Sequence, residues 1–322
     1  MQEKLRSRCG RGSESATMDR MRTRSEKGSD DARGGARDMA PEAWLRARVP
    51  AGGLGSSAKT LLNYLLTNIG EAVYARAAEV ARVAGVSVSS VTRLAQQLGF
   101  DGWPDLQRSL RARYLSGLSM VDVSEVHGVT DTPFQSAMRR DISSLTQAVR
   151  DLDEHAIRRI AELLTNASQI HVAAMGSFAA VGQALSHNLL LAGYPSYGLL
   201  DRDPLLANTV ARLGPSDVLV VCSYWRHYRV VVGAAIAARR RGAKVVVISD
   251  YLPQALAPVA EEVVLIPAEG TSFFASLTVP IAVQQGIMAT LARIDPERTR
   301  RQLEVSEELW GELDLLVDPL RG

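Results

Sequence analysis

The chain has 322 residues, 46% of them hydrophobic and 22% charged, so it is long enough for two folded domains with ordinary cores. Its two cysteines, Cys9 and Cys222, are too few for a disulfide framework, and we predict neither a metal site nor a cofactor. No apolar run approaches the roughly 18 residues of a membrane helix, and the charged N-terminus lacks the apolar centre of a secretory signal. We therefore expect a soluble, cytoplasmic protein without a membrane contact.

The net charge of +2 is distributed unevenly along the chain. Residues 1–50 carry 12 Lys or Arg against 8 Asp or Glu, residues 51–116 carry 7 against 4, and the remainder is acidic. A basic first part followed by an acidic second part is typical of a nucleic-acid-binding domain joined to a separate module.

Residues 1–50 are rich in Arg, Ser, Gly and Asp and contain few large apolar side chains. This composition cannot bury enough surface to fold, so we predict a disordered basic extension. It could contact DNA as a basic arm, but a dispensable extension is the favoured interpretation, and Met39 offers an alternative start of translation.

Two short helical patterns meet at Gly85, within residues 76–98. Small and branched side chains recur at helical spacing before Gly85, which suits the left-handed residue that ends a helix. Ser87 can cap the second helix. The apolar, inward face of that helix is predicted to consist of Val91, Leu94, Ala95 and Leu98. This spacing is that of a helix-turn-helix.

The outward face of the second helix is polar. We expect DNA contacts from Ser87, Ser89, Ser90, Thr92, Arg93, Gln96 and Gln97. Short hydroxyls near the helix N-terminus can approach phosphates and base edges, and the longer side chains can reach into a major groove. The alternative is a plain αα-hairpin whose polar face is only solvated.

Flanking helices complete a small all-helical domain over residues 51–116. The first is predicted to be capped by Ser56 or Ser57, and the last to begin at Phe100. The stretch AEVARVAGVSVSSVTRLAQQLGFDGWPDLQRSL resembles the N-terminal helix-turn-helix of the RpiR family of bacterial transcription regulators, and its GVS…VTRL…LGF pattern is quite specific. The resemblance implies a DNA-binding transcription factor.

Residues 117–132 are polar and irregular and are predicted to be a linker, followed by helices at 133–149 and 153–164. From Gln169 short β-branched strands alternate with Ala-rich helices. The predicted strands are 170–174, 196–199, 218–223, 245–249 and 263–266. The predicted helices are 179–192, 204–212, 229–241, 253–260 and 273–293.

Continuous apolar strands with helical crossovers predict an α/β domain over residues 133–295, with a parallel sheet covered by helices on both faces. Residues 296–322 are predicted to form a C-terminal helix. The segments RRGAKVVVISDYLPQALAPVAEEVVLIP and GTSFFASLTVPIAVQQGIM resemble the sugar-isomerase-type (SIS) domain that follows the helix-turn-helix in RpiR regulators. The resemblance covers residues 56–295 and implies that the domain binds a sugar phosphate or related metabolite and alters operator affinity.

Ligands in such sheets bind outside the C-terminal ends of the strands, so the loops after the first and third strands are the candidate ligand site. The family's first ligand loop, G-x-G-x-S, aligns with residues 174–178, where Phe178 stands at the serine position. Its second loop, S-x-S-G-x-T, aligns with residues 223–228 and retains only Ser223. The predicted ligand-binding residues are Gly176, Ser177, Ser223, Tyr224, Trp225, Arg226, His227, Tyr228 and Arg229.

These replacements change the expected ligand, because bulk and fixed positive charge stand where hydroxyls would hold a phosphate. Arg226 and Arg229, with His227 nearby, can still hold a carboxylate or phosphate. The side chains able to stack on a ring are Tyr224, Trp225 and Tyr228. We therefore predict a small anionic metabolite, of the sugar-phosphate or carboxylate type, held mainly by arginine. The alternative is a decayed site whose residues are surface or dimer-contact groups.

Catalysis is a competing interpretation, since sugar isomerases with this fold use a Glu or His as acid and base. Glu269 and His187 are the available candidates, but a lone loop Glu is more often solvated and a lone helical His more often packed. The three histidines without metal-ligand spacing are His127, His155 and His171. We expect no catalytic residue; an isomerase fused to a helical domain and an effector-independent DNA binder are the alternatives.

The resulting hypothesis is a regulator that binds a double-stranded DNA operator as a homodimer or homotetramer. Its protomers would associate mainly through the C-terminal domain and present paired recognition helices to half-sites about one or two DNA turns apart. Ligand bound at the strand ends would shift the population between two domain arrangements and so change operator affinity.

Overall fold

The computed structural model describes residues 39–128, 130–201 and 204–316. The disorder predicted for residues 1–38 lies outside the described residues. For the end of that extension the prediction is wrong, because Pro41–Ala47 forms helix α2, whose Trp44 and Leu45 are buried. These two large apolar side chains bury enough surface to order the helix, although the segment is polar on average.

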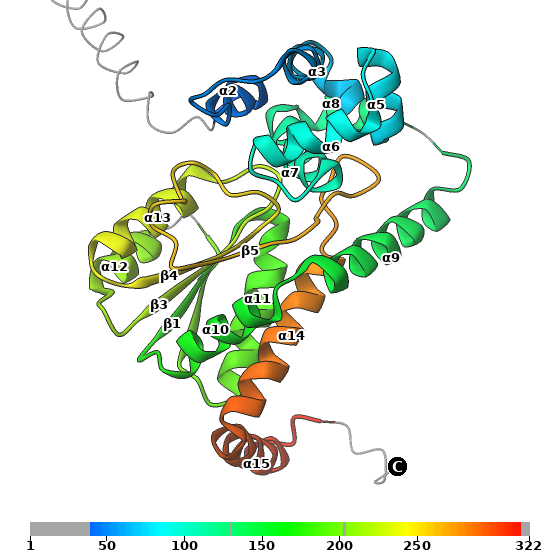
Figure 1. The fold of residues 1–322 in the computed structure, drawn as a ribbon. Coiled ribbons are helices and arrows are strands. Elements are labelled where there is room, and N and C mark those ends of the chain that lie inside the picture. The colour runs from blue at the N-terminus through cyan, green and yellow to red at the C-terminus, as the bar shows by residue number, and fades with distance from the viewer. Residues whose placement is uncertain (1–38, 129, 202–203, 317–322) are drawn as a thin grey trace, which may run out of the picture. The chain divides into compact units, whose positions relative to one another are not determined.

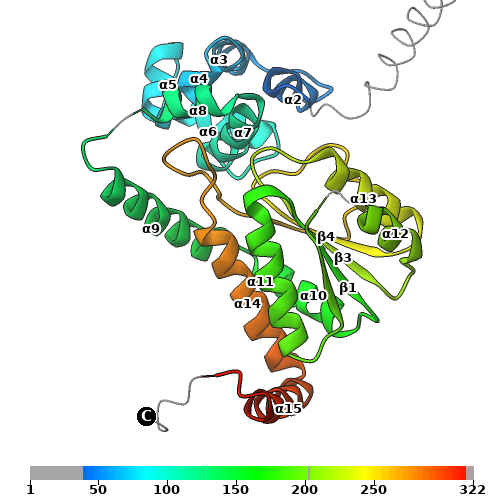
Figure 2. The ribbon, with the colours of Figure 1, turned by 180° about the vertical axis from the view of Figure 1, so that it is seen from behind.

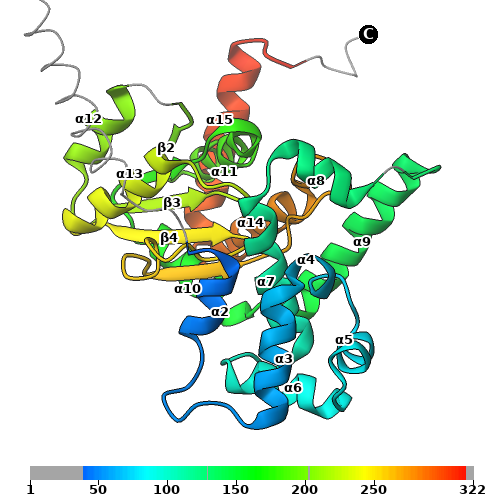
Figure 3. The ribbon, with the colours of Figure 1, turned by 90° about the horizontal axis from the view of Figure 1, so that it is seen from above.

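The helical domain continues with α3 (Ser56–Thr67), α4 (Ile69–Ala72), α5 (Ala77–Ala84), α6 (Val88–Gln97) and α7 (Trp103–Gly117), seen from above in Figure 3. Its core includes Leu61, Leu65, Val80, Val91, Leu94, Leu106 and Leu110, all with at most 1% of their surface exposed. The helices therefore share one apolar core, to which α2 adds Trp44 and Leu45.

Two predicted helix starts in this domain are wrong. Gly55 occupies the N-cap of α3 and no side chain caps it, so neither Ser56 nor Ser57 does. The last helix begins at Trp103 rather than Phe100, because Gly99 adopts a left-handed φ of 88° and Pro104 fits only the first helical turn.

The turn between α5 and α6 has the predicted geometry. Gly85 has φ 68°, and the Val86 N–H donates to the Ala81 carbonyl at 2.9 Å. The Ser87 Oγ accepts a hydrogen bond from the Ser90 N–H at 3.2 Å and so caps α6. The helix-turn-helix is confirmed.

The predicted linker 117–132 contains a helix, α8 (Met120–His127). Ser119 and Asp122 form a reciprocal capping box at its start, in which each side-chain oxygen accepts a hydrogen bond from the other residue's backbone N–H, and this stabilises the start of a helix in a polar sequence. Helices α9 (Pro133–Asp151) and α10 (Glu154–Thr165) follow as predicted, the latter capped by Asp153.

The α/β domain contains a five-stranded, all-parallel sheet in the order β2-β1-β3-β4-β5. The strands are β1 (Ile170–Ala173), β2 (Ser196–Leu199), β3 (Val218–Cys222), β4 (Lys244–Ser249) and β5 (Glu262–Leu265). The helices after β1 are α11 (Ala179–Leu191), α12 (Pro204–Arg212), α13 (Arg229–Arg240), α14 (Thr278–Ile294) and α15 (Pro296–Glu312). The parallel α/β prediction is confirmed.

Two predicted helices differ. Within the helix predicted at 253–260, residues 254–259 form turns, since Pro253 and Pro258 each lack a backbone donor. The helix expected from residue 273 begins at Thr278, which places Pro280 in the first turn where its missing N–H costs no hydrogen bond.

Alternate strand residues point to opposite faces of the sheet, and each face has its own core. Ile170 and Val172 pack with α10, α11 and α14, whereas Ala173 and Val221 pack with α12 and α13. Figures 1 and 2 show these two helix layers from opposite sides. Because β1 pairs with both β2 and β3, the loops after β1 and β3 leave the sheet side by side at the switch in strand order.

Across the part of the chain that the structure describes, none of the helices combines the length and apolarity that crossing a membrane requires.

Candidate functional site

The outward face of α6 is open to solvent. Its exposed predicted contacts are Ser87, Ser89, Arg93, Gln96 and Gln97, and its half-buried ones are Ser90 and Thr92. The Ser87 Oγ lies 2.9 Å from the Ser89 Oγ and 2.8 Å from the Ser90 Oγ. These three hydroxyls thus gather at the N-terminus of α6, the end of a helix that attracts phosphate.

In the loop after β1, the position expected to hold a phosphate is covered by a phenol. Gly176 has φ 63°, and a Cβ built there would lie 2.4 Å from the Tyr228 hydroxyl oxygen. Ser177 is exposed, whereas Phe178 is buried against Tyr224, with the two rings edge to face and their centroids 5.3 Å apart. Side chains of the second loop therefore contact this loop, although Gly176 and Ser177 remain exposed.

In the loop after β3, Ser223 and Tyr224 are buried. The prediction that Tyr224 stacks on a ligand ring is wrong, because its side chain is fully buried in the core below the sheet's strand ends. Burial also raises the pKa of the Tyr224 hydroxyl, which therefore stays protonated.

Trp225 is turned toward the helical domain. Its backbone N–H donates to both carboxylate oxygens of Asp250 at 3.0 Å, and its Nε1 donates to the Leu115 carbonyl of α7 at 2.7 Å. Its φ of 54° is unusual for a bulky residue and costs about 1 kcal/mol or more, which these bonds offset. The indole ring is thus fixed in place.

His227 belongs to the same contact with α7. Its ring packs edge to face with Tyr251, with the ring centroids 4.7 Å apart. The guanidinium carbon of Arg113 in α7 lies 4.9 Å from the Tyr251 ring centroid and 4.6 Å from that of Trp44. Burial, with the charge of Arg113, lowers the pKa of His227 to about 3. The ring is therefore neutral and adds no positive charge to an anion site, and its place among the ligand-binding residues stays a prediction.

The remaining predicted ligand residues lie at the surface of this loop. Arg226 and Arg229 are exposed, and Tyr228 is half-buried over Gly176. The two arginines are brought to the same loop, in which the Ser223 hydroxyl and both ring nitrogens of His227 are buried without a hydrogen-bond partner among the described residues. The loop after β3 is thus largely occupied by contacts within the protein.

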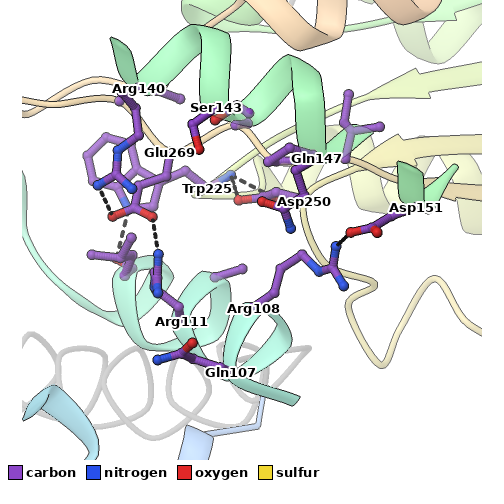
Figure 4. Close-up of a pocket in the computed structure, with 18 of the residues that line it drawn as sticks. Gln107, Arg108, Arg111, Arg140, Ser143, Gln147, Asp151, Trp225, Asp250 and Glu269 are labelled. Atoms are coloured by element: carbon purple, nitrogen blue, oxygen red, sulfur yellow. Dashed lines mark hydrogen bonds and ion pairs between the residues drawn. The ribbon is translucent and has the colours of Figure 1, made fainter. Parts of the chain in front are cut away.

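Glu269, one of the two residues considered for catalysis, lies in a cluster of donors (Figure 4). Its carboxylate forms ion pairs with Arg111 of α7 at 3.2 Å and with Arg140 of α9 at 3.1 Å. It also forms hydrogen bonds with the His127 Nε2 at 3.1 Å and with the Tyr74 hydroxyl at 3.3 Å. Side chains from α7, α8, α9 and the turn after α4 therefore converge on one carboxylate.

The donors decide the protonation state of Glu269. Burial alone would raise its pKa, but the hydrogen bond from His127 and the charges of Arg140 and Arg111 outweigh this and hold the pKa below its usual value. A carboxylate held in this way is a weak proton acceptor. His187, the other candidate, is exposed on α11.

Beside this cluster is a cavity of about 920 Å³, which we call the α7–α9 cavity (Figure 4). Its walls come from α7, α8 and α9, from Trp225 and Asp250 at the ends of β3 and β4, and from residues 266–275. The size suits a small organic ligand. Burial raises the pKa of Asp250 to about 7, although backbone N–H groups, that of Trp225 first, lower it.

Among the residues that the structure describes, no group of three or more His, Cys, Asp or Glu side chains could hold a metal ion. Cys222 is buried as a free thiol, and burial raises its pKa to about 12.

Family models match both domains. A helix-turn-helix domain of the rpiR family matches residues 48–117, and a SIS domain matches residues 163–288. The chain belongs to the RpiR family of transcriptional regulators. An uncharacterized HTH-type transcriptional regulator of Escherichia coli K12, YfhH, is 29% identical over 219 residues, which are 66% of this chain and 77% of that protein.

Two solved structures resemble this RpiR-family regulator. The sugar isomerase domain of an RpiR transcription factor from Sphaerobacter thermophilus matches with a TM-score of 0.53 and 28% identity, covering 55% of this chain and 99% of that one. The Vibrio vulnificus NanR protein complexed with ManNAc-6P matches with a TM-score of 0.54 and 20% identity, covering 86% and 100%. The second likeness shows the fold alone.

Sequence reasoning missed the α7–α9 cavity and the partners of Glu269 in this regulator. One signal was present. Polar residues recur along α9 at intervals of three or four positions, and those that line the cavity are Arg140, Ser143, Ser144, Gln147, Arg150 and Asp151. This spacing puts them on one side of a helix. The partners of Glu269 lie more than a hundred residues away in sequence and gave no comparable signal.

Proposed function

We propose that this RpiR-family regulator acts in the cytoplasm, binding a double-stranded DNA operator through α6 and changing its operator affinity when a small anionic metabolite binds. The observation that supports DNA binding best is α6 itself. Its inner face is buried in the domain core, and its outer face presents hydroxyls, two glutamines and Arg93 to solvent. Arg93 makes no ion pair with a described residue and is available to a phosphate or guanine.

A metabolite effector is supported by the fold of the second domain. The Vibrio vulnificus relative was solved with ManNAc-6P, so sugar phosphates are one candidate class. The exposed arginines of the loop after β3, Arg226 and Arg229, favour a ligand that carries a carboxylate or phosphate group.

We propose further that two copies pair through α9. Large apolar side chains on this helix are exposed at near-helical spacing, namely Phe134, Met138, Ile142 and Val149. A continuous exposed apolar stripe marks an interaction surface, and a two-fold axis would bring the same stripe of two copies together. Pairing would present two copies of α6 to a palindromic site.

The test is a genome-wide DNA pull-down with the purified full chain, followed by affinity measurement on the strongest fragment. A shared palindromic motif is expected, and Arg93→Ala should weaken binding to it by roughly 5- to 150-fold. Arg158→Ala on α10 is the matched control and should bind as the wild type does, because it removes an exposed arginine that, among the described residues, pairs only with Glu162. Broad binding without a motif would overturn the proposal.

An isomerase role has weaker support. Glu269 is held by four donors, and a base held in this way gains little by taking a proton. Turnover of hexose or pentose phosphates by the purified chain would overturn the non-enzymatic assignment.

A further inference from the structure

The arginines that line the α7–α9 cavity differ in whether they already form ion pairs with carboxylates of the chain. Arg111 and Arg140 both bind Glu269, and Arg108 binds Asp105 and Asp151. Arg150 lines the cavity without an ion pair to any described residue. An acidic ligand near the C-terminal end of α9 would therefore meet one unpaired guanidinium and a second, Arg108, whose present partner Asp151 is itself 41% exposed and easily solvated.

The neutral lining is suited to hydroxyl groups. Ser143 and Gln147 line the cavity, and neither side chain forms a hydrogen bond with another described residue. Figure 4 shows both on the α9 side, opposite Gln107 and Arg108 of α7. Each can donate and accept, which is what a polyhydroxylated carbon chain requires.

Trp225 supplies a rigid apolar surface in the same wall. Its backbone and indole hydrogen bonds to Asp250 and Leu115 hold the ring in one position before any ligand arrives. A pre-positioned aromatic face lowers the entropic cost of binding. Leu115, Ile266 and Phe274 extend the apolar part of the lining.

We propose that the α7–α9 cavity is the effector site, and that it takes a polyhydroxylated acid whose carboxylate or phosphate binds Arg150 and Arg108 while its carbon chain lies on Trp225. This proposal rests on the proposed function and gives that regulator a site distinct from the loop covered by Tyr228. The unpaired Arg150, the uncommitted hydroxyl and amide groups and the fixed indole ring are the observations that carry it.

The location also explains how ligand binding is coupled to the DNA-binding helix α6. Helix α7 forms one wall of the cavity, and its Leu106 and Leu110 are fully buried in the same core as α6. A ligand that binds Arg108 competes with Asp151 for it, so ligand-bound and ligand-free chains differ in how α7 is held to α9. A difference of this kind between two states is what allosteric coupling requires.

The experiment measures the melting temperature of the full chain against increasing concentrations of gluconate, 6-phosphogluconate and glucose 6-phosphate, with uncharged sorbitol as a control. At least one acid should raise the melting temperature of the wild type, and sorbitol should not. Arg150→Ala should raise the half-saturating concentration roughly tenfold or more, since it removes a charge-assisted hydrogen bond. Gln147→Leu should weaken binding less, and Arg158→Ala should leave it unchanged.

Ser143→Trp, which fills the cavity, should abolish the response. If this variant does not fold, Arg150→Ala and Gln147→Leu decide the question. The proposal is overturned if no acid stabilises the wild type, or if Arg150→Ala and Gln147→Leu respond as the wild type does. A response lost only in Arg226→Ala would place the ligand at the loop after β3 and also overturn it. The proposed function fails separately, when the chain binds no specific DNA sequence.

Discussion

The polar residues of the helix-turn-helix and those of the strand-end loops of the SIS domain lie in opposite environments. In the first, Arg93 and Gln97 point to solvent, as the local pattern predicts. In the second, Tyr224 and His227 were predicted to face a ligand but pack against the protein. Both regions have the expected backbone, so the difference lies in what distant parts of the chain bring to them.

This difference shows which properties are local. The capping of α6 by Ser87 and the turn at Gly85 involve neighbours in sequence. In the loop after β3, by contrast, the Trp225 Nε1 donates to the Leu115 carbonyl and the charge of Arg113 acts on His227, and both partners lie more than a hundred positions earlier in the chain. Fold topology places a crevice at the strand ends, but the side chains of other elements decide whether it stays open.

The largest expected loss of stability comes from Glu269→Ala, which removes the carboxylate that binds four donors distant in sequence. We expect the free energy of unfolding to fall by about 2–3 kcal/mol, less than the roughly 3–5 kcal/mol of a fully buried pair. The reason for the discount is that Arg111 and Arg140 keep 23% and 31% of their side chains exposed and can be solvated. Urea unfolding measures the change.

Glu162→Ala is the matched control for this substitution. Glu162 forms an exposed pair with Arg158 four residues away, and such pairs contribute well under about 1 kcal/mol. Equal losses in the two variants would contradict the view that the cluster around Glu269 holds the helical part of the chain to the α/β domain.

Asp250→Asn should change how stability depends on pH. Burial raises the pKa of Asp250 to about 7 in the folded chain, from a usual value of 3.8. The folded chain therefore binds more protons than the unfolded chain between these two values, and the contribution of Asp250 to stability falls as pH rises through this window. Its neutral amide replacement can still accept from the Trp225 N–H.

The measurement compares the melting temperatures of the wild type and Asp250→Asn at pH 5.5 and pH 8. Relative to the variant, the wild type should be more stable at the lower pH and should lose that advantage at the higher one. A constant difference between the two proteins would show that the Asp250 carboxyl does not titrate between these pH values.

The strands and most helices of the α/β domain could be predicted because each depends on periodicity within a few residues. The prediction failed where a few residues outweighed the average of a segment, as Trp44 and Leu45 do in α2 and the Ser119 capping box does in α8. Of the candidate site, the positions of the loops could be predicted, but the contact of Tyr228 with Gly176 could not. That contact depends on a side-chain direction that no local pattern specifies.

Gly176→Ala tests whether Tyr228 lies against Gly176 in the loop after β1. The substitution adds a Cβ 2.4 Å from the Tyr228 hydroxyl and requires alanine to adopt φ 63°, so we expect a loss of about 1–2 kcal/mol. Combining it with Tyr228→Ala removes the collision but not the backbone strain. The double variant should therefore be more stable than the sum of the two single changes predicts, and strict additivity would contradict the contact.

The smallest effect is expected in the helix-turn-helix, where the interaction is local. Ser87→Ala removes the side chain that caps α6 and should cost about 1 kcal/mol of unfolding free energy. Ser89→Ala is the control, because Ser89 is equally exposed and polar but accepts no bond from a backbone N–H of α6. A loss in Ser89→Ala as large as that in Ser87→Ala would mean that the three hydroxyls stabilise the helix start as a group. In that case even this region would depend on more than the single capping bond that its sequence pattern predicts.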